Sequence, residues 1–239
     1  MPAWAAVTLL RHRVPEAETV PLGVLTTLYI GVLSMLIGSL ASAEERQFGT
    51  LETQIMLPME AWRQWAVKAG VAMGLALLLA AGLLMLLWSV NPPDVRLDPL
   101  PLWPAAVGVL LVTASSLYVS TMSIGGVKAM VWSLPFLLAL VIWIRSVEWG
   151  WWVIVNSLRG VLPPAFVDWG VHRSIVRALP SLTAGAIVIA LLRAGLLNHR
   201  SADRSPTRVV RQLLSIAVFV TVVTLLTAIV VGLIALLRR

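Results

Sequence analysis

The sequence predicts an all-α fold, a polytopic bundle of membrane-spanning helices. Hydrophobic residues make up 59% of the 239-residue chain and charged residues only 12%. A globule of this size cannot bury that much apolar surface beneath a polar skin. Several uncharged runs reach the roughly 20 residues with which a helix crosses a bilayer. The runs are continuous in Leu, Val and Ala and do not alternate with polar residues, which excludes a transmembrane β-barrel.

Six apolar runs are expected to cross the membrane, of which the fourth ends at Arg145 and the fifth is interrupted near its end by Arg193. They are separated by segments that carry charges, prolines or both, and they cover about 19–43, 69–91, 103–122, 129–145, 179–197 and 212–237. Residues 19–239 are therefore predicted to form a single transmembrane domain. The preceding residues 1–18 have an apolar stretch too short to span, so they are expected to be an interfacial segment or the remnant of a longer chain.

The first two runs contain glycines at positions where helices could pack closely. Gly31 and Gly38 lie in the first run, and Gly70 and Gly74 form a small-xxx-small pair in the second. Small residues let helix backbones approach each other in a membrane. For any single one of these glycines, a position that faces lipid and has no role in helix packing is an equally good interpretation.

The fourth run contains Pro135, which is expected to kink it, and it ends among several tryptophans. Tryptophan collects at the lipid–water interface because its ring is apolar while its indole N–H needs a partner. These residues therefore indicate a membrane surface and not a cofactor site: Trp143, Trp149, Trp151 and Trp152.

Residues 149–178 are too interrupted to form another span. Arg159 lies within an apolar stretch, Pro163 and Pro164 break it, and further charges follow. We expect an interfacial or re-entrant pair of helices here.

Charge alone does not fix the orientation in the membrane. If the spans alternate, the segment 44–68 and the loop 198–211 lie on the same side. That side carries nine of the 18 Lys and Arg residues, namely Arg46, Arg63, Lys68, Lys128, Arg193, Arg200, Arg204, Arg208 and Arg211. The positive-inside rule therefore does not decide. Discounting the long segment 145–178 and the two C-terminal arginines favours a cytoplasmic position for 44–68.

The net charge of +7 lies in loops that flank apolar runs, so anionic lipid is the expected partner and nucleic acid is not. The chain has no cysteine. Lys128 follows two glycines without the spacing of a phosphate-binding loop, so no nucleotide cofactor is expected in this chain. Glu44 and Glu45 have no histidine within reach for a metal site, and we expect neither a metal nor an enzymatic activity.

The predicted spans carry almost no ionisable side chains in their interiors. Ion-coupled carriers usually place Asp, Glu or His at mid-membrane. Their absence argues against a secondary transporter and agrees with an energy source outside the bilayer, and a path of this kind would suit an apolar or amphiphilic substrate.

The segment 44–68 is the polar island between the first two spans. An apolar stripe at helical spacing follows it as Leu51, Ile55, Met59 and Trp62. Pro58 is expected to divide the stripe into two short surface helices. Ser42 and Glu45 have the spacing of a capping box, which predicts a new helix at the end of the first span.

The residues Glu45-Arg46-x-x-Gly49-Thr50-Leu51-Glu52, followed by Leu57-Pro58 and by Lys68 before an apolar span, resemble the permease subunits of the ABC type-2 transporter family. The resemblance implies that 44–68 is a cytoplasmic coupling helix that docks on a separate ATP-binding cassette subunit. The implied docking residues are Glu45, Arg46, Gly49, Thr50, Leu51, Glu52 and Pro58.

The same resemblance implies that ATP and magnesium bind to the partner subunit. It also implies a homo- or heterodimer of permease subunits in the plasma (inner) membrane of a bacterium. The family usually has one more span before the motif, which residues 1–18 are too short to supply, so a truncated or split permease is expected. The alternative is a membrane scaffold or assembly subunit without its own transport activity.

Overall fold

The computed structural model describes residues 19–47, 60–90, 102–123, 125–157, 169–199 and 206–237. Within these ranges the chain forms helices and no strand, which confirms the predicted all-α class. In chain order the helices are α2 (Thr19–Gln47), α4 (Ala61–Val90), α5 (Leu102–Ser120), α6 (Gly126–Ser157), α8 (Trp169–His199) and α9 (Pro206–Leu237).

Each of these six helices contains a stretch that is long and apolar enough to cross a membrane. The stretches are Leu25–Ala43, Ala61–Leu86, Trp103–Ser120, Gly126–Val153, Leu179–His199 and Thr207–Thr227. Each overlaps one of the six runs predicted from the sequence, although several of the bounds differ, and the fold is that of a multi-pass helical membrane protein.

The first helix does not end where the sequence analysis expected. α2 continues to Gln47, so Ser42 lies inside the helix, where it is buried, and no new helix begins there. The predicted capping box is therefore wrong. The physical reason is that no glycine or proline occurs between Ser42 and Gln47, and Glu, Arg and Gln sustain a helix well.

The second predicted surface helix is likewise the start of a span. α4 begins at Ala61 and runs unbroken to Val90, so Trp62 and Lys68 belong to its first turns. The carbonyl of Glu60 accepts hydrogen bonds from the N–H groups of Arg63 (2.9 Å) and Gln64 (3.3 Å). Polar side chains do not end a helix, because its hydrogen bonds run along the backbone. Pro58 and the first predicted surface helix lie outside the described residues.

The predicted interfacial segment 149–178 is divided between two long helices. Its first part continues α6 to Ser157, and its last part opens α8 at Trp169. Residues 158–168 lie outside the described ranges. α6 also continues through Pro135, and α8 continues through Pro180. Arg145 and Glu148, one turn apart on α6, form an ion pair of 2.9 Å, so the charges at the expected helix end are compatible with a continuing helix.

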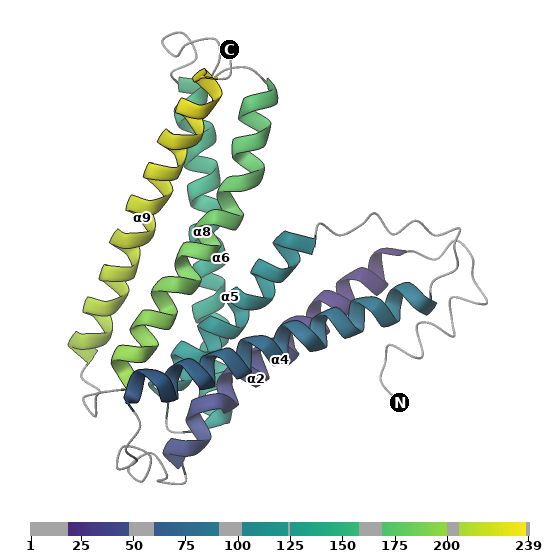
Figure 1. Cartoon of the computed structure of the whole chain (residues 1–239), viewed down its shortest axis with the longest axis vertical. Helices are drawn as coiled ribbons and strands as arrows, with labels where there is room; N and C mark the ends of the chain where they lie inside the picture. The colour runs from purple at the N-terminus through teal and green to yellow at the C-terminus, as the bar shows by residue number, and fades with distance from the viewer. Residues whose placement is uncertain are drawn as a thin grey trace.

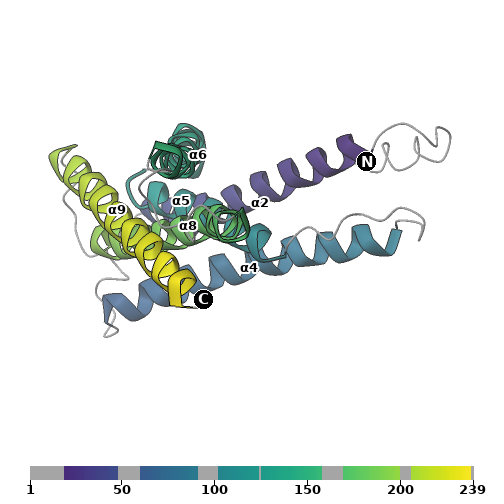
Figure 2. The ribbon, with the colours of Figure 1, turned by 90° about the horizontal axis from the view of Figure 1, so that it is seen from above.

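The helices form two groups that meet at α5. In Figure 1, α6, α8 and α9 run along the long axis, whereas α2 and α4 lie beside each other and extend obliquely away from them; Figure 2 shows the same divergence from above. α5 packs against α2, α4, α6 and α8. α5 and α8 are therefore the centre of the described bundle.

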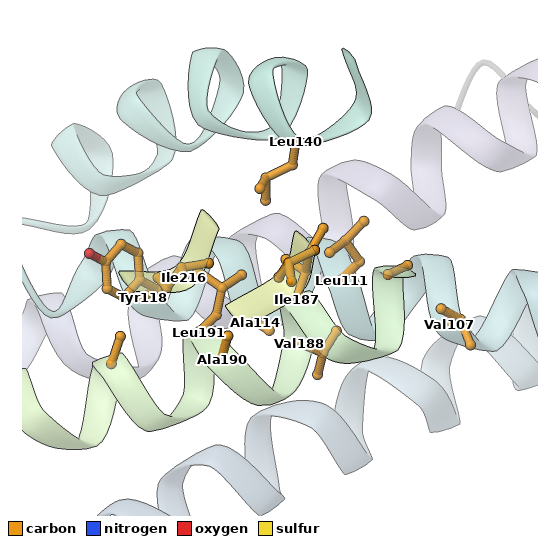
Figure 3. Close-up of a cluster of buried hydrophobic side chains, with 13 residues drawn as sticks. Val107, Leu111, Ala114, Tyr118, Leu140, Ile187, Val188, Ala190, Leu191 and Ile216 are labelled. Carbon is orange, nitrogen blue, oxygen red and sulfur yellow. The ribbon is translucent and has the colours of Figure 1, made fainter. Parts of the chain in front are cut away.

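The main apolar core lies between α5 and α8 and is completed by side chains from α6 and α9 (Figure 3). Its labelled members include Leu111, Ala114, Tyr118, Leu140, Ile187, Leu191 and Ile216. Leu191 and Ile187 are almost completely buried, so this core fixes how α5 and α8 lie against each other.

α2 and α5 approach each other closely at one glycine. A Cβ atom added at Gly38 would overlap Oγ of Ser116 and lie 2.6 Å from the carbonyl oxygen of Thr113. By contrast, a Cβ added at Gly31, Gly70 or Gly74 would meet nothing within 4 Å. Of the glycines suggested for helix packing, Gly38 alone has this role in the part of the chain that the structure describes.

Successive helices alternate in direction, so six helix termini gather at one end of the bundle, the lower end in Figure 1. We call this the basal end. It contains the last turns of α2, α5 and α8 and the first turns of α4, α6 and α9. The alternation predicted from the sequence is therefore present, and the chain leaves α2 for segment 48–59 and enters α4 at this end.

The Gly38 contact gives a test of the packing. We expect Gly38→Ala to destabilise the protein by about 1–3 kcal/mol, because the added methyl group overpacks the α2–α5 interface. Gly31→Ala, on the same helix but in open space, is the control and should not be destabilising. Thermal unfolding of the two variants in one detergent measures the difference. Equal stability of both variants would contradict the close approach.

Candidate functional site

The predicted coupling residues lie only partly within the described chain. Glu45 and Arg46 belong to the last turn of α2. The remaining five, Gly49, Thr50, Leu51, Glu52 and Pro58, lie outside the described residues. What the structure describes is where the chain enters and leaves this segment, and how the first turns of α4 are connected to the bundle.

The first turn of α4 carries an exposed cluster of three side chains. The carboxylate of Glu60 accepts a hydrogen bond from Nε1 of Trp62 and lies 3.3 Å from Nε of Arg63. The Arg63 guanidinium lies 5.5 Å from the centre of the Trp62 ring. Exposed pairs of this kind contribute little stability. They do give the basal end a surface with both aromatic and charged groups.

Trp62, the last residue of the predicted apolar stripe, does not pack into the bundle. Trp62 is 47% exposed, whereas Trp65, three residues later, is 4% exposed. The packed face of α4 therefore starts at Trp65.

Trp65 connects the start of α4 to the end of α8. Its indole Nε1 donates a hydrogen bond of 3.1 Å to the carbonyl oxygen of Leu192. Its ring occupies the space beside Gly195, where an added Cβ would overlap Cζ2 and lie 2.7 Å from Cη2. The imidazole of His199 lies 5.8 Å from the Trp65 ring, centre to centre. An indole fits here because residue 195 has no side chain.

A second group of polar side chains joins α5, α8 and α9 at the same end. Asn198 donates from Nδ2 to Oγ1 of Thr121 (3.2 Å) and accepts at Oδ1 from Nε2 of Gln212 (2.7 Å). Oε1 of Gln212 in turn accepts from the hydroxyl group of Tyr118 (3.2 Å). We call these four residues the amide network. Each member donates a hydrogen bond to another member or accepts one from it. These bonds offset the cost of removing the polar groups from water.

The junction between α8 and α9 has a further contact. Nη2 of Arg208 donates a hydrogen bond of 2.9 Å to the carbonyl oxygen of Leu197. A helix ends with carbonyl groups that have no partner within the helix. A cation in this position supplies one and also interacts favourably with the negative end of the helix dipole.

Most charged side chains that the structure describes lie toward the basal end. These are Glu60, Arg63, Lys68, Lys128, Arg193, Arg208 and Arg211. Toward the opposite end, the described charged side chains are Arg145 and Glu148, which pair with each other. The sequence has nine further Lys and Arg residues on the other side, among them Arg173 and Arg177 near the start of α8, so the two ends of the bundle do not differ in their number of positive charges.

The roles of Trp65, Gly195 and the amide network were not predicted from the sequence. Asn198 and Gln212 stand beside apolar runs, and amide side chains in that position are a signal that could have been used. No signal in the sequence pairs Trp65 with Gly195, because the two are far apart along the chain.

The described contacts of the basal end position helices relative to one another. The searched residues contain no group of three His, Cys, Asp or Glu side chains that could hold a metal ion. The contacts of Trp65 and Asn198 are instead directional bonds between helices. They determine how α4, α5, α8 and α9 lie relative to one another.

Comparison of the chain with family models, curated proteins and solved structures found no match. The class that its fold defines is a multi-pass helical membrane protein.

The amide network can be tested by removing its central residue. We expect Asn198→Ala to lower the free energy of unfolding by about 1–3 kcal/mol, because Thr121 and Gln212 lose a buried partner. Asn156→Ala, at an exposed position of α6, is the matched control. Thermal unfolding in detergent measures both. A control variant that loses as much stability as Asn198→Ala would contradict the role of the network.

Proposed function

We propose that this chain is the transmembrane permease subunit of an ATP-driven exporter of the ABC type-2 family. In this proposal, residues 44–68 receive the movement of a separate ATP-binding subunit. That partner binds ATP and magnesium, and two permease subunits together surround the transport path in a bacterial inner membrane.

The observation that carries the proposal is the position of the family-like residues between two spans. Glu45 and Arg46 end α2, and the segment from Gly49 to Pro58 leads into α4. A partner bound to this segment would contact the chain next to the first turn of α4. Trp65, in the second turn, is bonded to α8, so the partner would act close to a contact between helices.

The cytoplasmic basal end is part of the proposal: the Lys and Arg residues of the whole chain divide equally between the two sides, and this orientation follows when the long segment 145–178 and the two C-terminal arginines are discounted. Positively charged residues near span ends favour the cytoplasmic side, and Arg193, Arg208 and Arg211 flank a short loop at the basal end. An ATP-binding partner would require the same orientation, because ATP is supplied from the cytoplasm.

Co-purification tests the coupling. A tagged chain isolated from its native membrane should retain an ATP-binding subunit and stimulate its ATPase activity. Glu52→Ala and Gly49→Leu should each reduce the recovery of this subunit or the stimulation several-fold, because both lie in the proposed docking segment.

Glu148→Ala and Gly82→Leu are the matched controls, since Glu148 lies toward the opposite end and a Cβ at Gly82 meets nothing within 4 Å. Recovery of no ATP-binding subunit, together with docking variants that behave like the controls, would favour a scaffold or assembly subunit instead.

Labelling of single cysteines tests the orientation. The chain has no native cysteine, so Thr53→Cys provides a unique thiol in the segment that follows α2. A membrane-impermeant maleimide should label it only after the cells are permeabilised. Asp98→Cys, in the segment between α4 and α5, should be labelled on intact cells. The reverse pattern would exclude a cytoplasmic docking segment.

A further inference from the structure

The buried face of α4 is uniform except at one residue. Beyond Trp65, its buried side chains are all alanines, spaced three or four residues apart: Ala69, Ala72, Ala76 and Ala80. Methyl groups let neighbouring helices pack closely but make no directional bonds. Along this face, α4 is held by apolar contacts, to which the partly buried Met73 and Leu77 also contribute.

The contact at Trp65 has the opposite character. The indole donates a hydrogen bond to the Leu192 carbonyl, and its ring fills the space beside Gly195. A hydrogen bond has a preferred direction, and the ring cannot shift toward α8 without meeting the backbone. We call Trp65, Leu192 and Gly195 the pivot contact. It fixes α4 at its basal end, while the remainder of α4 extends obliquely away from α8 (Figure 1).

The amide network lies within one helical turn of the pivot contact. Asn198 is three residues beyond Gly195 on α8, and its side chain bonds to Thr121, after α5, and to Gln212 on α9. A displacement of α8 at this end therefore acts on α5 and α9 through hydrogen bonds and not only through apolar packing.

We propose that the pivot contact transmits movement of the proposed docking segment, Gly49 to Pro58, to α8, and that Asn198 transmits it onward to α5 and α9. Trp65 and Gly195 are then positioning residues, which act through α8 and need not touch a transported molecule. This inference rests on the proposed function for the source of the movement. The mechanical connection between α4 and α8 can be measured without any partner.

The first measurement is the distance between α4 and α8 in the full chain reconstituted in lipid nanodiscs. Spin labels on cysteines at Met85 and Ile189, which are 73% and 63% exposed, report the angle between the two helices. Gly195→Ala displaces the indole, and Trp65→Phe removes the N–H donor. Each should broaden or shift the distance distribution.

Two variants of the same chemistry serve as controls. Trp62→Phe changes an exposed tryptophan of α4, and Gly70→Ala adds a methyl group where nothing lies within 4 Å. Both should leave the distribution unchanged. A distribution in Gly195→Ala and Trp65→Phe that equals the one in these controls would overturn the inference.

The double variant tests whether Trp65 and Gly195 act together. Phenylalanine lacks the Cζ2 and Cη2 atoms of indole, which lie nearest to the position of an added Cβ at Gly195. Gly195→Ala should therefore cause no further broadening in a Trp65→Phe background, because residues in contact have non-additive effects. Additive broadening would mean that the two residues act independently, which would overturn the pivot contact.

The second measurement separates transmission from docking. In the complex with the co-purified ATP-binding subunit, Gly195→Ala and Trp65→Phe should retain the subunit at the level of the unsubstituted chain but lose stimulation of its ATPase activity several-fold. Undiminished stimulation would overturn the transmission role. If the unsubstituted chain recovers no ATP-binding subunit, the proposed function fails, and the distance measurement alone decides the connection between α4 and α8.

Discussion

The described bundle depends on the ability of α5 to contact four helices at once. Burial on so many sides removes its hydroxyl groups from water, which costs free energy unless each hydroxyl finds a partner. The hydroxyls of Thr113, Ser115 and Ser120 all donate to carbonyl groups of α5 itself. α5 can therefore be rich in Ser and Thr and still lie at the centre of a membrane bundle. Small side chains here also permit the close approach of α2 at Gly38.

A lipid environment explains why specific contacts matter so much in this fold. Apolar side chains gain little by leaving lipid for protein, so helices associate through close packing and hydrogen bonds. Large apolar side chains such as Leu78, Val131 and Leu214 remain exposed on α4, α6 and α9, as expected for surfaces that face lipid. Directional bonds between helices occur at the basal end, through Trp65 and Asn198, and also farther along α8, where the hydroxyl oxygens of Thr183 and Thr224 lie 3.3 Å apart. In the proposed permease, the partner would act at this interconnected end.

Much of the fold could be predicted because the relevant signals are local. An apolar run of sufficient length identifies a span wherever it occurs, and successive spans alternate in direction because each one crosses back over the membrane. The ends of the helices were predicted less well, at Ser42, between 61 and 68, and within 149–178. Hydropathy reports which residues suit lipid, whereas a helix continues as long as its backbone bonds are not broken. Most of the predicted docking residues stay a prediction, since they lie outside the described part of the chain.

The sequence by itself determined the class of the protein, its six spans and their alternation, because composition and length decide what can cross a bilayer. Only the tertiary structure decided that Trp65 and not Trp62 is buried, and that Asn198 is bonded to helices on two sides. These contacts join residues as far apart as 127 positions along the chain, in the case of Trp65 and Leu192. Which side chains meet at such separations depends on how whole helices cross, and no local pattern contains that information.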